Sequence, residues 1–388
     1  MPETPRHAVV AGAGIGGLTA ALALHRQGWR VTVCERAAAP AAVGAGIVLA
    51  PNALRAYDAI GFDATRAAGR AVPASLGVRR PDGARLSRAD TAALAARYGR
   101  PPLAVHRAAL TAALAQALPG GTLVYGAGVT AVDGDGGRAV VRTAAGDLTA
   151  DTVVAADGIH SALRRRHFPD HPGLHYAGET AWRTVLPSGP AAEAAETWGR
   201  GERFGTVPLA DGRVYLYATA VVPEGYRPAD VRGELLRRFG TWHDPIPALL
   251  ARIDPAAVLQ HDLYDLAAPL PRLHDGRTAW IGDAAHAMTP NLGQGGCQAV
   301  EDAVVLAHLL RGRDVPAALA AYTRARLART DAIRVRARRM GRVAALTHPL
   351  AVAARDLALR AAPASAARRA LDDLFDGFTL PAPPALPE

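Results

Sequence analysis

Hydrophobic and polar residues recur with two periods along this chain, and the two periods separate the expected strands from the expected helices. Apolar runs at residues 8–11 and 29–34 predict strands, and between them Leu18 and Leu22 lie on one face of a helix. Gly28 is placed to end that helix. Together the three segments predict a β-α-β unit of about thirty residues.

Helical and strand-like segments continue to alternate after this unit. Leucines at four-residue spacing predict a helix at 107–118. Residues 121–151 contain short alternating runs broken by Asp-Gly turns, which predict a small antiparallel meander. The apolar run at 152–156 then predicts a buried strand.

Aromatic residues concentrate between positions 176 and 261, where strand-like runs become dominant. The runs at 180–185 and 213–220 predict strands, and 229–239 predicts a helix. This change of character indicates a second domain, built on a sheet and inserted into the first.

The earlier pattern returns with an apolar strand at 278–281, a long helix at 294–310 and an Ala- and Arg-rich helical region at 315–375. We therefore predict an α/β fold, in which a Rossmann-like domain carries an inserted domain with a mixed β-sheet and is followed by C-terminal helices. The expected domains are 1–175 (with 71–100 as a segment that could join the inserted domain), 176–270, 271–315, 316–376 and a tail at 377–388.

Composition narrows the possible chemistry. All 44 basic residues of the 388 are arginine, which excludes Schiff-base lysines and P-loop nucleotide binding. The net charge is +9, and eight arginines lie between positions 324 and 342 against the single acid Asp331. Without interleaved aromatic residues these arginines favour a solvated helix over nucleic-acid binding. Two cysteines and no spaced histidine cluster predict no metal site, and no apolar run is long enough to span a membrane.

The first glycine motif fits G-x-G-x-x-G at the start of the β-α-β unit. Gly12 permits the tight turn, Gly14 lets a pyrophosphate approach the backbone, and Gly17 lets helix and strand pack closely. The helix that begins near Ile15 and Gly16 offers free N–H groups to a phosphate. Glu35 follows the second strand and can accept hydrogen bonds from a ribose diol. This order of elements indicates a dinucleotide, either NAD or FAD.

Two further glycine–acid motifs follow buried strands. Asp157 and Gly158 end the strand at 152–156, and Ser161 is a suitable N-cap for a short helix that carries Arg164. The third motif starts with Gly282-Asp283 and continues through residues 290–296 into the long helix. Such a helix N-terminus stabilises negative charge on a ring bound against it.

The three motifs, in this order and at these separations, resemble those of the class A flavoprotein monooxygenases, which have the para-hydroxybenzoate hydroxylase fold. The stretch 282–306 resembles most the subgroup of urate hydroxylase, salicylate hydroxylase and zeaxanthin epoxidase. The resemblance covers most of the chain to about Arg342. It implies that the first domain binds FAD non-covalently and that the inserted domain binds the substrate.

The resemblance also implies roles for individual positions. It assigns the FAD pyrophosphate to the first glycine motif, the adenosine end to Glu35 and Arg36, and the phosphate and ribityl region to Arg107. The implied cofactor-binding residues are Gly12, Gly14, Ile15, Gly16, Gly17, Glu35, Arg36, Gly46, Ile47, Arg107, Asp157, Gly158, Asp283, Pro290, Gly293, Gly295 and Gly296. His286 is expected to have a structural or flavin-proximal packing role rather than to act as a base.

The implied reaction consumes NADPH or NADH as a transient reductant, and O2. It forms a C4a-hydroperoxyflavin that hydroxylates, or less readily epoxidises, an electron-rich aromatic or heteroaromatic molecule. Tyr215 and Tyr217 share one face of their strand, and Arg183 and Arg203 lie in strand-like segments. We therefore name these four residues as candidates for substrate contact, the arginines for an anionic substrate.

Other readings use fewer of the motifs. An NAD-dependent dehydrogenase would leave residues 282–296 unexplained. A flavin-dependent halogenase needs a lysine, and this chain has none. A DNA-binding protein would give none of the three motifs a function. A non-oxygenating flavin-dependent reductase of the same fold is the main alternative. We expect a cytoplasmic monomer or homodimer with no nucleic-acid or membrane partner.

Overall fold

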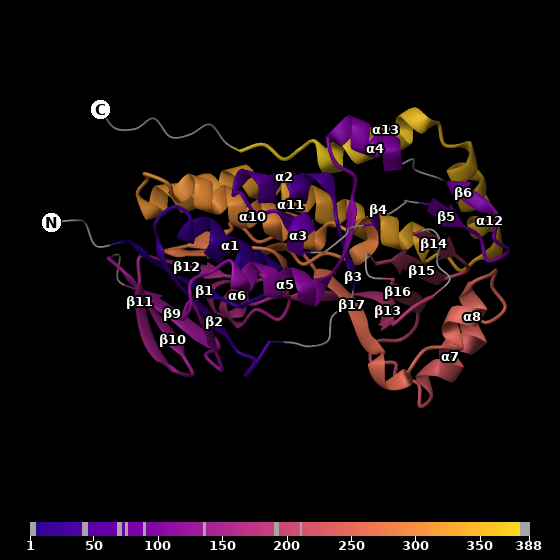
Figure 1. Ribbon diagram of the computed structural model, residues 1–388, viewed down its shortest axis with the longest axis horizontal. Helices are drawn as coiled ribbons and strands as arrows, with labels where there is room; N and C mark the ends of the chain where they lie inside the picture. The colour runs from indigo at the N-terminus through magenta and orange to yellow at the C-terminus, as the bar shows by residue number, and fades with distance from the viewer. Residues whose placement is uncertain are drawn as a thin grey trace.

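A computed structural model describes residues 5–40, 46–67, 72–73, 77–87, 91–134, 137–189, 194–209 and 212–380. Within these ranges two large sheets lie at opposite ends of an elongated molecule, and long helices run along both (Figure 1). Both described termini lie near the end that contains the parallel sheet (Figure 1).

The first large sheet has six strands in the order β18-β19-β12-β1-β2-β8, and all its pairings except β18 with β19 are parallel. Its central strand β1 is fully buried, as apolar strands of a parallel sheet usually are. The helices α1 and α10 pack on it and form one continuous hydrophobic core with it. The bounds are β1 His7–Ala11, α1 Ile15–His25, β2 Arg30–Glu35, β8 Leu123–Tyr125, β12 Thr152–Ala155, β18 His274–Asp275, β19 Thr278–Trp280 and α10 Gly295–Leu310. The predicted β-α-β unit is confirmed.

The predicted meander is only partly correct. Strands β9 (Val129–Gly134), β10 (Ala139–Thr143) and β11 (Gly146–Ala150) form the expected antiparallel sheet. Strand β8, which we included in the meander, instead pairs in parallel with β2. A strand of three residues is too short to show a hydrophobic periodicity, so only its pairing shows which sheet it joins.

The second large sheet has seven strands in the order β17-β13-β16-β15-β14-β5-β6. Trp182, Phe204 and Phe239 bury one of its faces against α7 and α8, and we call this the outer face. Tyr215, on the opposite or inner face, packs with Ala104 of β7. The bounds are β5 Gly77–Arg79, β6 Arg85–Ser87, β13 Leu174–Leu186, β14 Ala195–Trp198, β15 Glu202–Pro208, β16 Val214–Val221, α7 Val231–Phe239, α8 Ile246–Leu250, the 3-10 turn η1 Pro255–Ala257 and β17 Leu259–Leu266.

A small third sheet, β3-β7-β4, stands between the two large ones. Its strands are β3 Gly46–Leu49, β4 Val72–Pro73 and β7 Leu103–His106. Helices α2 (Pro51–Ala59), α3 (Ala64–Ala67), α4 (Thr91–Tyr98) and α5 (Arg107–Gln116) belong to the same part of the chain. Strands β5 and β6, from within 71–100, join the seven-stranded sheet, whereas the domain boundaries themselves stay predictions.

The C-terminal region is helical as predicted, and it divides into α11 (Val315–Ala344), α12 (Pro349–Ala361) and α13 (Ala364–Phe375). Helix α11 runs along α10, and α13 returns to α2 and α4, where Asp372 accepts hydrogen bonds from Arg97 and Tyr98 (Figure 1). In the described ranges, no helix combines the length and apolarity that crossing a bilayer requires.

Candidate active site

The first glycine motif joins β1 to α1 in a turn that excludes side chains at two positions. Gly12 has φ +106°, and a Cβ there would lie 2.5 Å from the carbonyl oxygen of Ala156. A Cβ on Gly17 would lie 2.0 Å from the carbonyl oxygen of Gly12. Around Gly14, in contrast, no atom of the described residues other than its chain neighbours lies within 4 Å of the added Cβ position. The loop is therefore tight on its protein side and open at Gly14.

Helix α1 begins at Ile15 without a side-chain cap and without an acid in its first turn. Its N–H groups and the positive end of its dipole thus stay available to an anion. Ile15 is buried, and Gly16 faces α10, because a Cβ there would lie 3.1 Å from the Cβ of Ala299. These two residues fix the start of the helix rather than line open space.

Glu35 lies at the end of β2, beside the glycine loop. Its Oε2 accepts a hydrogen bond from the backbone N–H of Ala13 at 2.8 Å, and its Oε1 accepts one from Ala37 at 2.9 Å. The carboxylate is only half-buried, so it retains lone pairs for a ribose hydroxyl. Arg36, the next residue, is exposed.

The second motif follows β12 and contains an unsatisfied acceptor. Asp157 Oδ1 is buried and has no hydrogen-bond partner among the described residues, whereas its Oδ2 lies 3.4 Å from the N–H of Leu163. Gly158 has φ +80°. Because buried acceptors are normally satisfied, Asp157 Oδ1 marks a position for a polar ligand group.

Helix α6 (Ala162–His167) connects the second motif to the third. Ser161 caps this helix as predicted, by accepting a hydrogen bond from the N–H of Arg164 at 2.9 Å. The buried Arg164 then donates to the carbonyl oxygens of Asp283, Ala284 and Ile159, at 3.2, 3.0 and 2.6 Å. Two segments more than a hundred residues apart in sequence are thereby held at one edge of the sheet.

The third motif starts with α9 (Asp283–His286) and leads through the 3-10 turn η2 (Pro290–Leu292) into α10. Asp283 is exposed between buried neighbours, and its Oδ1 lies 3.8 Å from the position of a Cβ on Gly295. Pro290 is exposed, and Gly293 has φ +62°. Like α1, helix α10 has neither a side-chain cap nor an acid in its first turn, so its N-terminus is also open to negative charge.

Strand β3 brings the two remaining candidate segments together. A Cβ on Gly296 would lie 2.6 Å from Cδ1 of Ile47, so α10 begins directly against β3. Gly46 pairs with His106, and the next residue, Arg107, is exposed at the start of α5. Gly46 also leaves room for Tyr215, whose Cδ1, Cγ and Cβ atoms lie 2.5–2.8 Å from the position of an added Cβ.

A buried charge network that the sequence analysis missed holds the third motif in place through hydrogen bonds to Gly282 and His286. Asp302 accepts hydrogen bonds from His286 Nε2 at 2.5 Å, from the N–H of Gly282 at 2.9 Å and from Arg326 at 2.7 Å. Glu301 accepts from Arg326 at 2.5 Å. Burial opposes the charge of Asp302, but His286 and Arg326 outweigh it and hold the pKa of its carboxyl below the ordinary range. The Glu301-Asp302 pair in the sequence was the available signal.

The two cysteines and His286 occupy structural positions. Cys34 and Cys297 are free and buried, and burial raises the pKa of the Cys34 thiol to about 11. His286 contacts Asp302, in keeping with the expected packing position. Among the described residues, no group of three or more His, Cys, Asp or Glu side chains could hold a metal ion.

The four substrate-side candidates share the inner face of the seven-stranded sheet, because Arg183 pairs with Tyr217 on adjacent strands and Tyr217 with Gly205. The rings of Tyr215 and Tyr217 lie 5.7 Å apart. Both tyrosines face the small sheet that carries Gly46, and Tyr217 is only half-buried.

Arg203 has a different environment from the one we expected. Its guanidinium is buried and donates to Glu179 at 3.0 Å, to Thr219 at 3.0 Å and to Asn291 at 2.6 Å. Glu196 lies 3.5 Å away. No sequence pattern indicated these carboxylates, because they lie on other strands. Arg203 already has anionic partners in the protein, and through Asn291 it ties the sheet to the loop before α10.

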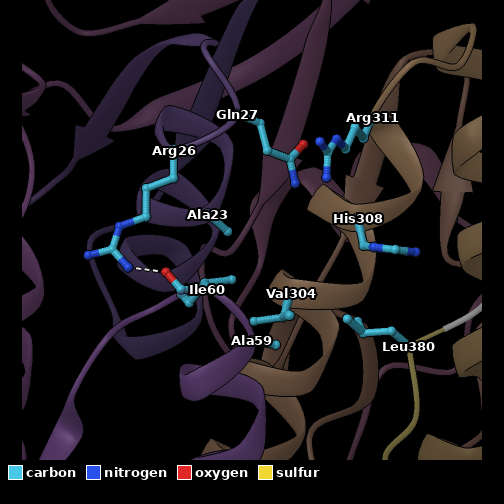
Figure 2. Close-up of a pocket in the computed structure, with 9 residues that line it drawn as sticks. All are labelled: Ala23, Arg26, Gln27, Ala59, Ile60, Val304, His308, Arg311 and Leu380. Atoms are coloured by element: carbon cyan, nitrogen blue, oxygen red, sulfur yellow. Dashed lines mark hydrogen bonds between the residues drawn. The ribbon is translucent and has the colours of Figure 1, made fainter. Parts of the chain in front are cut away.

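A hollow of about 200 Å³ lies between the far ends of α1 and α10 and is lined by none of the predicted site residues (Figure 2). Within it, Arg26 donates a hydrogen bond to the carbonyl oxygen of Ile60. Its lining consists of Ala23, Arg26, Gln27, Ala59, Ile60, Val304, His308, Arg311 and Leu380. Because these residues lie at the opposite ends of α1 and α10 from the glycine motifs, the hollow is separate from the candidate site.

Comparison with known proteins identifies the family and the cofactor of this chain. The family described as FAD binding domain matches residues 6–337 of this chain. The chain belongs to this family. Its cofactor is FAD, and the flavin-dependent monooxygenases are the enzymes that it resembles throughout.

Individual relatives match over most of their length. Aurachin C monooxygenase/isomerase of Stigmatella aurantiaca is 40% identical over 342 residues, which are 86% of this chain and 88% of the relative. A 2-heptyl-3-hydroxy-4(1H)-quinolone synthase of Pseudomonas aeruginosa is 34% identical over 379 residues, 95% of this chain and 97% of the relative. The crystal structure of Klebsiella pneumoniae HpxO complexed with FAD and uric acid is 30% identical, with a TM-score of 0.89 over 96% of this chain and 97% of that one.

The residues of this flavoprotein fit FAD on three independent observations. Space is open at Gly14, where a pyrophosphate would approach the backbone. Asp157 Oδ1 is a buried acceptor without a partner in the described chain. The starts of α1 and α10 both lack a side-chain cap and an acid in the first turn, so both can accept negative charge.

Proposed function

We propose that this protein is an FAD-dependent monooxygenase that uses NADPH or NADH and O2 to hydroxylate a fused-ring nitrogen heterocycle. The observation that carries the proposal is the position of the FAD motifs, which assemble beside the inner face of the seven-stranded sheet. Gly46 of the flavin side contacts Tyr215 of the sheet, so a ring bound there would lie between the two.

The substrate class comes from chemistry that the relatives share. Uric acid, bound by HpxO, and the quinolone named for the Pseudomonas enzyme are both fused bicyclic rings with N–H groups. The inner face carries two tyrosine rings and, opposite Tyr217, the side chain of Arg183. These groups support binding of a flat ring that also forms hydrogen bonds. Hydroxylation is favoured over epoxidation, because such rings are electron-rich at carbon.

The proposed roles of the cofactor-site residues follow from their geometry. The first glycine motif would hold the pyrophosphate at the start of α1, and Glu35 would bind the adenosine ribose. Asp157 and Asp283 would bind the middle of the cofactor, and α10 would face the isoalloxazine ring through Gly295 and Gly296. Arg36, exposed next to Glu35, would lie at the adenosine end, and Arg107, exposed at the start of α5, would pair with a phosphate.

When bound, FAD accepts hydride from the reduced nicotinamide and reacts with O2, and the protein supplies orientation and charge. The N-terminus of α10 stabilises negative charge next to Gly295. The network of Asp302, Arg326 and His286 fixes the backbone at Gly282, which positions Asp283. Tyr215 packs over Gly46 and excludes water from that side.

The test is turnover by the FAD-loaded protein with urate and with 4-quinolones. Stimulated NAD(P)H oxidation and a product heavier by one oxygen atom would support the proposal. Oxidation that no heterocycle stimulates, together with turnover of benzoates, would overturn the substrate class but leave the monooxygenase activity standing. Oligomeric state and a cytoplasmic location stay predictions.

A further inference from the structure

A polar row crosses the inner face of the seven-stranded sheet at right angles to its strands. Register places Arg183 of β13 beside Tyr217 of β16, Tyr217 beside Gly205 of β15, and Gly205 beside Glu196 of β14. Because residues directly opposite one another share a face, the side chains of Arg183, Tyr217 and Glu196 all project toward the flavin side. Glu196 was not among the residues that the sequence pointed to.

Gly205 lets the tyrosine reach the carboxylate. A Cβ at this position would lie 2.0 Å from Cζ and 2.5 Å from the hydroxyl oxygen of Tyr217. The hydroxyl end of the ring therefore lies over Gly205. Glu196 is the residue opposite Gly205 on the next strand, so the tyrosine hydroxyl and the Glu196 carboxylate are neighbours on the inner face. The lone pairs of the Tyr217 oxygen stay available to a donor from the substrate.

The charge of Glu196 is only partly compensated. Its side chain keeps 24% of its surface accessible and lies 3.5 Å from Arg203 Nη1. Arg203 is shared, because Glu179 accepts from its other terminal nitrogen at 3.0 Å. Two carboxylates thus face one guanidinium, and burial, which outweighs the attraction of Arg203, raises the pKa of Glu196.

We propose that Tyr217 and Glu196 form an acceptor site that binds a ring N–H or phenolic O–H of the substrate and removes its proton. This rests on the proposed function, because it needs a heteroaromatic or phenolic ring at the inner face. The substrate N–H bond breaks and its proton bonds to the Tyr217 oxygen, while the original hydroxyl proton of Tyr217 moves to the Glu196 carboxylate. The electron pair left on nitrogen is delocalised into the ring and raises electron density at the carbon that is oxygenated.

The charged groups around Glu196 give the expected pH dependence. Arg203 and Glu179 face it from β15 and β13, and Tyr217 from β16. Arg355, from α12, lies over the neighbouring Trp198 ring and is paired with Asp356 at 2.8 Å. Since only ionised Glu196 can take the proton, turnover of an N–H substrate should rise with pH through the raised pKa of Glu196 and then level off.

The experiment compares Glu196→Gln, Tyr217→Phe and Gly205→Ala with the control Glu202→Gln in the FAD-loaded protein. Glu202 is a matched control, because its side chain is also 24% accessible and pairs with an arginine, Arg238, at 2.7 Å. It lies on the neighbouring strand, with its side chain on the outer face. The probes are 4-quinolone and N-methyl-4-quinolone, which differ only in the acidic proton, with salicylate as an O–H probe.

We expect Glu196→Gln to lower kcat for the N–H probe by about 10²–10⁴-fold and to abolish its rise with pH. Gly205→Ala should have the same effect by displacing the Tyr217 ring, and Glu202→Gln should leave the pH profile unchanged. The N-methyl probe should bind about tenfold more weakly than 4-quinolone to the wild type. The N-methyl probe should bind Glu196→Gln as tightly as it binds the wild type. If Glu196 had only a structural role, the substitution would weaken binding of both quinolones.

The inference is overturned if Glu196→Gln keeps the wild-type pH profile, or if it weakens binding of both quinolones equally. Should Gly205→Ala fail to fold, the comparison of Glu196→Gln with Glu202→Gln still decides the matter. If only salicylate is hydroxylated, the same pH comparison with that probe decides the role of Glu196. Failure of the monooxygenase activity itself has a different signature, because the wild type would then oxygenate neither urate nor any of the three probes.

Discussion

Replacement of Gly14 by alanine separates cofactor binding from folding more cleanly than any other change in the first motif. Apart from its chain neighbours, no atom of the described residues lies within 4 Å of the added Cβ, and Gly14 has ordinary extended dihedral angles, φ −74° and ψ 179°. The apoprotein of Gly14→Ala should therefore unfold within about 1 kcal/mol of the wild type. The FAD pyrophosphate, in contrast, would meet the new methyl group.

The expected loss of FAD affinity follows from the hydrogen bonds at the start of α1. Hydrogen bonds to charged groups contribute about 1.5–3 kcal/mol each, so displacing the pyrophosphate from two N–H groups costs at least about 3 kcal/mol. The dissociation constant of FAD should rise by at least about a hundredfold. Titration of the apoprotein with FAD, followed by flavin fluorescence, measures this constant, and urea unfolding of the apoprotein measures stability.

Two other glycines serve as controls for this experiment. Gly17→Ala brings a Cβ to 2.0 Å from the Gly12 carbonyl oxygen, so it should destabilise the apoprotein itself. Gly28→Ala, after the other end of α1, strains a residue with φ +84° and should cost about 1 kcal/mol without weakening FAD. FAD affinity of Gly14→Ala within about threefold of the wild type would refute the placement of the pyrophosphate.

Three further predictions concern charged residues. Arg326→Ala removes the guanidinium that the fully buried Glu301 and Asp302 share, which leaves Glu301 with Arg329 and Asp302 with His286. It should lower the free energy of unfolding in urea by about 3 kcal/mol, and a loss below about 1 kcal/mol would contradict the network. Asp283→Ala should weaken FAD by at least about tenfold with unchanged apoprotein stability, and unchanged flavin occupancy after gel filtration would argue against its role. Hydrogen bonds from Arg237 and Arg238 lower the pKa of Glu234 from 4.5 to about 2, so its contribution to stability should be lost as pH falls from 4.5 toward 2. Glu234→Gln should flatten that part of the stability profile, and an unchanged acid slope would rule this contribution out.

The geometry of the first glycine motif was predictable because its features are local in sequence. Gly12, Gly14 and Gly17 lie within one turn, and Glu35 follows the strand that this turn leads to. Steric exclusion at Gly12 and Gly17 depends on backbone that the β-α-β unit itself supplies, so the spacing alone carries the information. The family match to residues 6–337 confirms the FAD prediction.

The substrate side was less predictable because its contacts join distant strands. Arg203 is paired with Glu179, 24 residues away, and with Asn291, 88 residues away, and no short-range pattern records such pairs. Its sequence context therefore suggested a partner in the substrate where the structure shows partners in the protein. Tyr217 was found from strand periodicity, but its contact with Glu196 depends on Gly205 and on the register of three strands.

Strand β8 was misassigned for a related physical reason. Its three residues follow a turn and resemble the start of the meander, yet they add to the edge of the parallel sheet beside β2. Pairing at a sheet edge depends on which neighbouring strand has an unpaired edge. A run of three residues contains no sequence pattern that predicts this partner.

The measurement that tests the central claim most directly is aerobic NADH and NADPH oxidation by the FAD-loaded protein, with peroxide and product measured together. We predict that a fused-ring N–H heterocycle such as urate or a 4-quinolone stimulates oxidation, with little peroxide and a product that has gained one oxygen atom. Oxidation that no aromatic compound stimulates, or stimulated oxidation whose product contains no new oxygen, would contradict a monooxygenase and favour a non-oxygenating flavin reductase of the same fold.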